Sequence, residues 1–154
     1  MPGYKTHLMG GFIAFSLLVV AIGAVYGSLS TLIEWLCCAF FGALFPDIDI
    51  KSKGQQLFFR VLGVLFLILL WQRRIVDIAI MSTLAFLPLT VKHRGITHSL
   101  WFLVGLCAAM LFIVAAAAAS YLSIVFFDLL FFVAGFFSHI LLDFGPRQLL
   151  RVKK

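Results

Sequence analysis

Long apolar segments follow one another along this chain, with only short polar breaks between them. An α-helix needs roughly 20 apolar residues, and at least about 17, to cross the hydrocarbon core of a bilayer. A backbone inside lipid must satisfy its polar groups internally, so segments of this kind form transmembrane helices. We therefore predict an all-α fold, a polytopic transmembrane helix bundle, in which residues 1–154 form a single transmembrane helical domain.

The composition agrees with a membrane protein. Hydrophobic residues make up 64% of the chain and charged residues 12%, whereas soluble domains average roughly 45–50% and about 25%. The net charge of +6 would also suit a nucleic-acid partner. However, the basic residues flank the predicted spans, where membrane topology and lipid headgroups account for them. We therefore expect membrane lipids as partners and no nucleic acid.

The apolar segments predict about six spans, and the basic residues predict their orientation. The predicted spans are 8–26, 30–45, 56–71, 75–91, 99–119 and 121–142. With six spans, ten of the twelve basic residues fall on the face that also carries both termini. The positive-inside rule assigns this face to the cytoplasm.

The same predicted face carries the residues that most favour a metal. All four histidines and three of the six acidic residues fall there, namely His7, Asp47, Asp49, His93, His98, His139 and Asp143. In SHILLD (138–143) the histidine and aspartate are four residues apart, so both point from one face of a helix. FPDID (45–49) follows the second span, and HRGITHSL (93–100) offers a Gly turn with Thr97 or Ser99 as a cap for the fifth.

Imidazole and carboxylate together suit Zn²⁺, with Mn²⁺ or Fe as alternatives. Seven candidate ligands are enough for one or two ions, and a two-metal centre can activate water against a phosphoester. Taken singly, each of these histidines is more often an interfacial or packed residue than a ligand. Their conjunction on one face is what predicts a metal site there.

The order of these motifs resembles a known family. His7, FPDIDIKSKGQ, HRGITHSL and GFFSHILLDF follow one another as in the bacterial membrane-bound metal-dependent hydrolases, which include the LexA-regulated inner-membrane protein of enterobacteria. The resemblance covers most of the chain and implies a multi-pass helical protein of the inner membrane with a divalent-metal hydrolase site. It maps the motif residues onto the seven candidate ligands. The scattered His and Asp residues are also loosely similar to zinc-dependent phospholipase C.

We therefore expect a metal-dependent hydrolase that acts on a lipid or lipid-linked phosphate. Asp49 would act as general base, and Arg94 would stabilise the charge that develops on the phosphate. Amide or ester hydrolysis remains open. The alternative is a metal-binding membrane scaffold or transporter without hydrolase activity. A transporter is less favoured because the centres of the predicted spans hold no charge or histidine, where transporters place their ligands.

Overall fold

The structure of the chain is a computed structural model, and it describes residues 3–22, 28–49, 52–71, 73 and 99–144. Within these ranges all regular structure is helical and there is no strand, as the apolar segments predict. The predicted fourth span, 75–91, lies outside the described residues.

The helices begin and end within a few residues of the predicted spans. The elements are α1 (Tyr4–Ile22), α2 (Leu29–Leu44), the 3-10 helix η2 (Phe45–Asp49), α3 (Lys53–Trp71), α5 (Leu100–Ala117), the 3-10 helix η3 (Ala119–Tyr121) and α6 (Leu122–Phe144). The first span starts earlier than predicted, so His7 lies inside the first turns of α1 and not at the edge of the helix. FPDID, predicted as the exit from a span, continues α2 as a short 3-10 helix.

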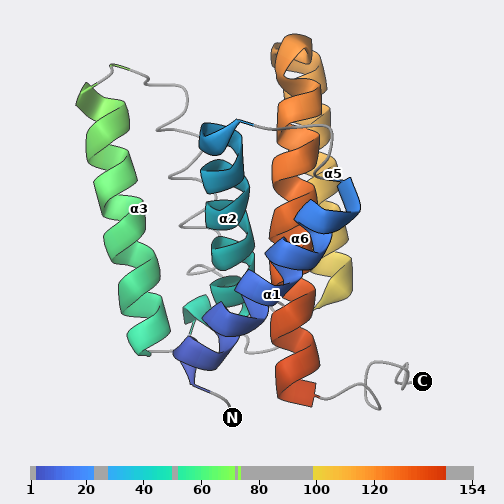
Figure 1. Cartoon of the computed structure of the whole chain (residues 1–154). Helices are drawn as coiled ribbons and strands as arrows, with labels where there is room; N and C mark the ends of the chain where they lie inside the picture. The colour runs from blue at the N-terminus through green and yellow to red at the C-terminus, as the bar shows by residue number, and fades with distance from the viewer. Residues whose placement is uncertain (1–2, 23–27, 50–51, 72, 74–98, 145–154) are drawn as a thin grey trace.

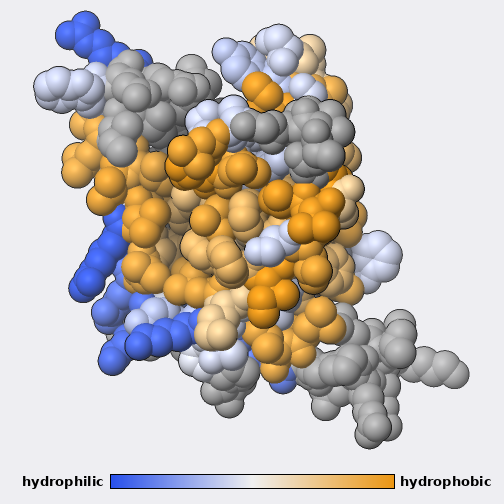
Figure 2. All heavy atoms as spheres, viewed as in Figure 1, coloured by the Kyte–Doolittle hydropathy of each residue, from blue (hydrophilic) through white to orange (hydrophobic). Residues whose placement is uncertain are grey.

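Four of these helices are long and apolar enough to cross a membrane. They are Tyr4–Ile22, Leu29–Ile48, Leu100–Ala117 and Ala119–Asp143. The predicted third span forms α3, which is not among the four helices of the described chain that meet this measure. Side chains such as Val20, Trp101 and Phe112 are more than three-quarters exposed. Figure 2 shows a broad hydrophobic surface across the middle of the visible face, as expected for a surface that faces lipid.

In Figure 1, α1, α3 and α5 run toward the upper end of the bundle and α2 and α6 run toward the lower end, and this brings distant parts of the chain to one end. The start of α1, the end of α2, the starts of α3 and α5 and the end of α6 all lie at the lower end in Figure 1. Each of the motifs around His7, Asp47 and His139 is therefore carried to the same end.

The centre of the bundle is a close crossing of α2 and α6, which make the most extensive helix–helix contact of the described chain. A Cβ atom added at Gly42 would overlap the backbone oxygen of Phe132, and one added at Gly135 would overlap that of Ala39. Small residues thus allow the two backbones to touch, which is how helices without a hydrophobic driving force associate in lipid. Beside this contact, Trp35 stacks on Phe131 with ring centroids 4.7 Å apart.

The tilted helix α1 crosses in front of α2 and α6 (Figure 1) and also approaches through glycines. A Cβ atom at Gly11 would lie 2.9 Å from Cβ of Ala43, and one at Gly10 would lie 2.7 Å from Leu142. These contacts bring the side of α1 that carries His7 against both partner helices, so that this histidine is only 1% exposed.

A hydrogen bond joins the 3-10 helix η2 to the first turn of α3. Ser52 caps this helix, because its Oγ accepts a hydrogen bond from the backbone N–H of Gln55 at 3.0 Å. The side chain of Gln55 turns back and donates from Nε2 to the carbonyl oxygen of Ile48 at 2.7 Å. One residue therefore joins the start of α3 to η2, the element that presents Asp47.

Replacing Gln55 by alanine should lower the free energy of unfolding by about 1 kcal/mol, the usual net contribution of one partly buried hydrogen bond. The measurement is unfolding in detergent, followed by circular dichroism. Gln56→Ala is the matched control. Gln56 is the next residue of α3 and is exposed, and the same substitution changes helix propensity equally at both positions. Equal loss in both variants would contradict the role of the Gln55–Ile48 bond.

Candidate metal centre

Four side chains that could hold a metal meet at the lower end of the bundle. His7 comes from α1, Asp47 from η2, and His139 and Asp143 from the last turns of α6. The two histidines are 1% and 0% exposed, and the side chains of Asp143 and Asp47 are 6% and 26% exposed. Polar groups buried to this degree need partners, because an unsatisfied buried polar atom is costly.

The orientation of His139 is set by the backbone of α2. Its Nδ1 lies 2.7 Å from the carbonyl oxygen of Ala43. A carbonyl can only accept, so Nδ1 donates its proton and, in the neutral ring, Nε2 carries the lone pair. Metal-binding histidines usually make this bond with their other ring nitrogen, which fixes both the tautomer and the ring plane.

The Nε2 atom of His139 points at two carboxylates. It lies 3.3 Å from Oδ2 of Asp143 and 3.7 Å from Oδ1 of Asp47. A lone pair facing two anionic oxygens is unfavourable unless a cation lies between them, either a proton on the ring or a metal ion. His139 and Asp143 lie on one face of α6, as their i,i+4 spacing predicts.

His7 completes the cluster from the other side. Its ring stacks on that of His139, with centroids 3.9 Å apart and planes inclined by 17°. Its Nε2 lies 3.5 Å from Oδ1 of Asp143, which therefore faces both histidines. Within the described chain, neither ring nitrogen of His7 has a hydrogen-bond partner, although both are buried.

Three nitrogen–oxygen pairs of the cluster are close enough for both of their atoms to contact one ion. Ligand atoms of His7, Asp47 and His139 all lie within 4.8 Å of one another. Two ligands at about 2.1 Å from one zinc ion are at most about 4.2 Å apart. The three nitrogen–oxygen separations, 3.3, 3.5 and 3.7 Å, are within that limit. The donor set of imidazole nitrogen and carboxylate oxygen therefore fits a borderline divalent cation.

The structure thus brings together four of the seven predicted ligands. The side chain of Asp49 lies outside the described residues, and so do His93, Arg94 and His98. Ser99 occupies the N-cap position of α5, as predicted, although its side chain makes no capping bond. Thr97, the other predicted cap, lies outside the described chain.

Sequence reasoning missed the residues that position the ligands. These are the Ala43 carbonyl, the glycines of the α2–α6 crossing and the Gln55 side chain. The small residues had a readable signal, because Ala39 and Ala43 have the small-xxx-small spacing of close helix contacts. The Ala43 carbonyl had no such signal in the sequence.

Membrane-length apolar helices around a buried histidine–aspartate cluster define this chain as an α-helical membrane protein. In comparison with family models, residues 1–148 match the family described as YdjM inner membrane protein. The chain therefore belongs to the YdjM family of inner membrane proteins. No curated protein and no solved structure gave a match. The bacterial inner-membrane part of the predicted resemblance is confirmed, whereas the hydrolase remains a prediction.

Proposed function

We propose that this protein is a membrane-embedded, divalent-metal-dependent hydrolase that cleaves a phosphoester of a lipid or lipid-linked phosphate at the membrane interface. The observation that carries the proposal is the buried cluster of His7, Asp47, His139 and Asp143. Two stacked imidazoles with two carboxylates at 3.3–3.7 Å from their Nε2 atoms favour a metal-binding role over packing alone.

His7, Asp47, His139 and Asp143 would hold the metal, which we expect to be Zn²⁺, with Mn²⁺ or Fe as alternatives. His93, His98 and Asp49 are the further predicted ligands, and with them the centre would have enough donors for two ions. A divalent ion bound there would supply Lewis-acid polarisation of the phosphate and an activated water.

Other roles in the proposed reaction fall to individual residues, which orient a ligand, admit the substrate, accept a proton or stabilise charge. The Ala43 carbonyl keeps the His139 ring from rotating, so that Nε2 stays directed at Asp47 and Asp143. Asp47 is the most exposed of the four groups, which favours approach of the substrate from its side. Asp49 would accept the proton of the attacking water, and Arg94 would stabilise the developing negative charge.

The proposal includes a location for the site. We place the chain in the inner membrane as a multi-pass protein with both termini and the metal centre on the cytoplasmic face. The family assignment and the membrane-length helices support a membrane protein, and the predicted distribution of basic residues supports this orientation. A centre at the end of the bundle would reach a phosphate headgroup while the lipid tails stay in the bilayer.

The test is hydrolysis of a lipid phosphate by the full-length protein. Purified protein is loaded with Zn²⁺ or Mn²⁺ and given vesicles that contain phosphatidic acid, and the released phosphate is measured. Asp47→Asn should lower the rate by about 100-fold or more, because loss of a residue that merely supports a ligand already costs roughly 10- to 100-fold. Asp128→Asn, a carboxylate elsewhere on α6, should leave the rate unchanged.

Equal rates for wild type and Asp47→Asn would overturn the proposed role of the cluster in hydrolysis. A structural role is the second candidate, because the cluster joins α1, η2 and α6 and an ion there would tie the three together. A structural scaffold would be favoured by three results together. The metal would bind in stoichiometric amount, it would stabilise the protein, and the loaded protein would hydrolyse no phosphate, amide or ester substrate.

A further inference from the structure

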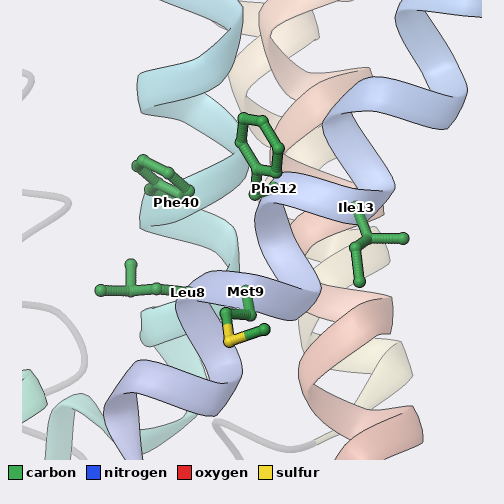
Figure 3. Close-up of a pocket in the computed structure, with 5 residues that line it drawn as sticks. All are labelled: Leu8, Met9, Phe12, Ile13 and Phe40. Atoms are coloured by element: carbon green, nitrogen blue, oxygen red, sulfur yellow. The ribbon is translucent and has the colours of Figure 1, made fainter.

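An apolar groove runs along the outer side of α1, against α2. It has a volume of about 260 Å³ and is lined by Leu8, Met9, Phe12, Ile13 and Phe40. Figure 3 shows Leu8, Met9, Phe12 and Ile13 on α1 and Phe40 on α2, with Phe40 on the side of Leu8 and Phe12. Met9, Phe12 and Ile13 are each more than half exposed, so the groove is open to the surroundings of the bundle. All its lining residues lie within helices of membrane-spanning length.

A cation lies at one end of this groove. Lys5, Met9 and Phe12 have i, i+4 and i+7 spacing and so share one face of α1. Lys5 is exposed and is one turn closer than the groove to the lower end of the bundle. A lysine in this position can extend its ammonium group to the headgroup level while its methylene stem follows the apolar surface.

A second cation is brought close by the packing of α3. The first turn of α3 lies against that of α1, because a Cβ atom at Gly54 would be 3.2 Å from Cβ of Tyr4. Lys53 precedes Gly54 and is exposed. Neither α1 nor α3 contains an acidic residue, so neither helix places a negative charge of its own in its first turn. Figure 2 shows hydrophilic side chains gathered at this lower-left edge, beside the hydrophobic surface.

We propose that this surface binds one anionic phospholipid, with an acyl chain in the α1–α2 groove and the phosphate at Lys5 and Lys53. The charge complementarity selects an anionic lipid, and the apolar lining selects its hydrocarbon chain. The site is separate from the metal cluster, because His7 faces the inside of the bundle whereas Met9 and Phe12 face outward. It therefore does not depend on the hydrolase proposal.

The test is native mass spectrometry of the delipidated full-length protein, titrated with palmitoyl-oleoyl phosphatidylglycerol or with phosphatidylcholine of the same chains. Wild type should retain one phosphatidylglycerol in preference to phosphatidylcholine. Lys5→Gln should weaken phosphatidylglycerol binding about fivefold, the usual effect of one basic residue at an anionic surface. It should leave phosphatidylcholine binding unchanged. Phe12→Ala should weaken binding of both lipids several-fold, since it removes one wall of the groove.

Matched controls separate this site from general attraction to lipid. Arg73→Gln removes an exposed cation beyond the far end of α3, and Phe112→Ala removes a lipid-exposed ring on α5. Neither should change the retention of either lipid. Equal binding of the two lipids by wild type would overturn the proposal. The proposal would also be overturned if Arg73→Gln and Phe112→Ala weakened lipid binding as much as Lys5→Gln and Phe12→Ala do. His139→Asn should still bind the lipid, so failure of the metal centre and failure of this site are distinguishable.

Discussion

Replacing Gly135 by alanine should strongly destabilise the folded protein in detergent. The added Cβ would overlap the backbone oxygen of Ala39, and a backbone atom of a packed helix cannot move aside as a flexible side chain can. Separating α2 from α6 would undo the largest helix–helix contact of the described chain and lengthen the His139–Ala43 hydrogen bond. We expect a loss of at least about 3 kcal/mol in the free energy of unfolding, at the upper end of overpacking effects.

Gly105→Ala is the control for this variant. Gly105 lies on α5, and no atom of the described chain is within 4 Å of a Cβ added there, so the same substitution meets no packed backbone. It should leave the free energy of unfolding unchanged or slightly higher, because alanine favours a helix more than glycine does. The readouts are elution from size-exclusion chromatography and unfolding followed by circular dichroism. A monodisperse Gly135→Ala protein with wild-type stability would contradict the close crossing of α2 and α6.

Replacing His139 by asparagine should remove the metal while keeping the helix contact. The side-chain amide of asparagine places its NH₂ group near the position of Nδ1, so the bond to the Ala43 carbonyl can be retained. The position of Nε2, which faces Asp47 and Asp143, is lost. We expect affinity for Zn²⁺ to fall by at least about 100-fold, because even a residue that only supports a ligand contributes roughly 10- to 100-fold.

The measurement is elemental analysis of the purified protein, followed by titration with Zn²⁺ and Mn²⁺. Wild type should hold about one or two equivalents, and Asp128→Asn should match wild type because Asp128 lies earlier on α6, away from the cluster. Circular dichroism of His139→Asn should be close to that of wild type. Wild-type protein that neither contains nor takes up metal would overturn the metal assignment. So would full metal content in His139→Asn.

Much of the fold could be predicted because lipid restricts the choice of structure. The helices at Leu29–Leu44 and Leu100–Ala117 begin and end within two residues of the predicted spans. Here hydropathy and polar breaks mark the ends directly. The start of α1 was misplaced because Tyr4, Lys5 and Thr6 look like a polar leader in sequence, whereas in the structure they form the first turn of the helix. Six spans were predicted, and four helices of the described chain have membrane-spanning length and hydropathy.

The cluster could be predicted in part because helices that cross the bundle in opposite directions gather polar groups from distant segments at one end. The i,i+4 spacing of His139 and Asp143 fixed their shared face. Stacking of His7 on His139 could not be predicted, because it depends on how far α1 tilts and how closely its glycines approach Ala43. The hydrogen bond from His139 to the Ala43 carbonyl oxygen could not be predicted from the sequence either, because every residue offers the same backbone acceptor.

The cluster is assembled from widely separated parts of the polypeptide, and this has a consequence for biogenesis. Ribosomes deliver α1 to the membrane long before α6, so a nascent chain carries the imidazole of His7 without its later neighbours. At that stage the polar ring faces lipid or the insertion machinery, an arrangement that favours a mobile α1 at the headgroup level. Only when α6 arrives can this ring leave the surface and stack on His139. The packing of α1 therefore depends on α6, the latest of the described helices to be synthesised.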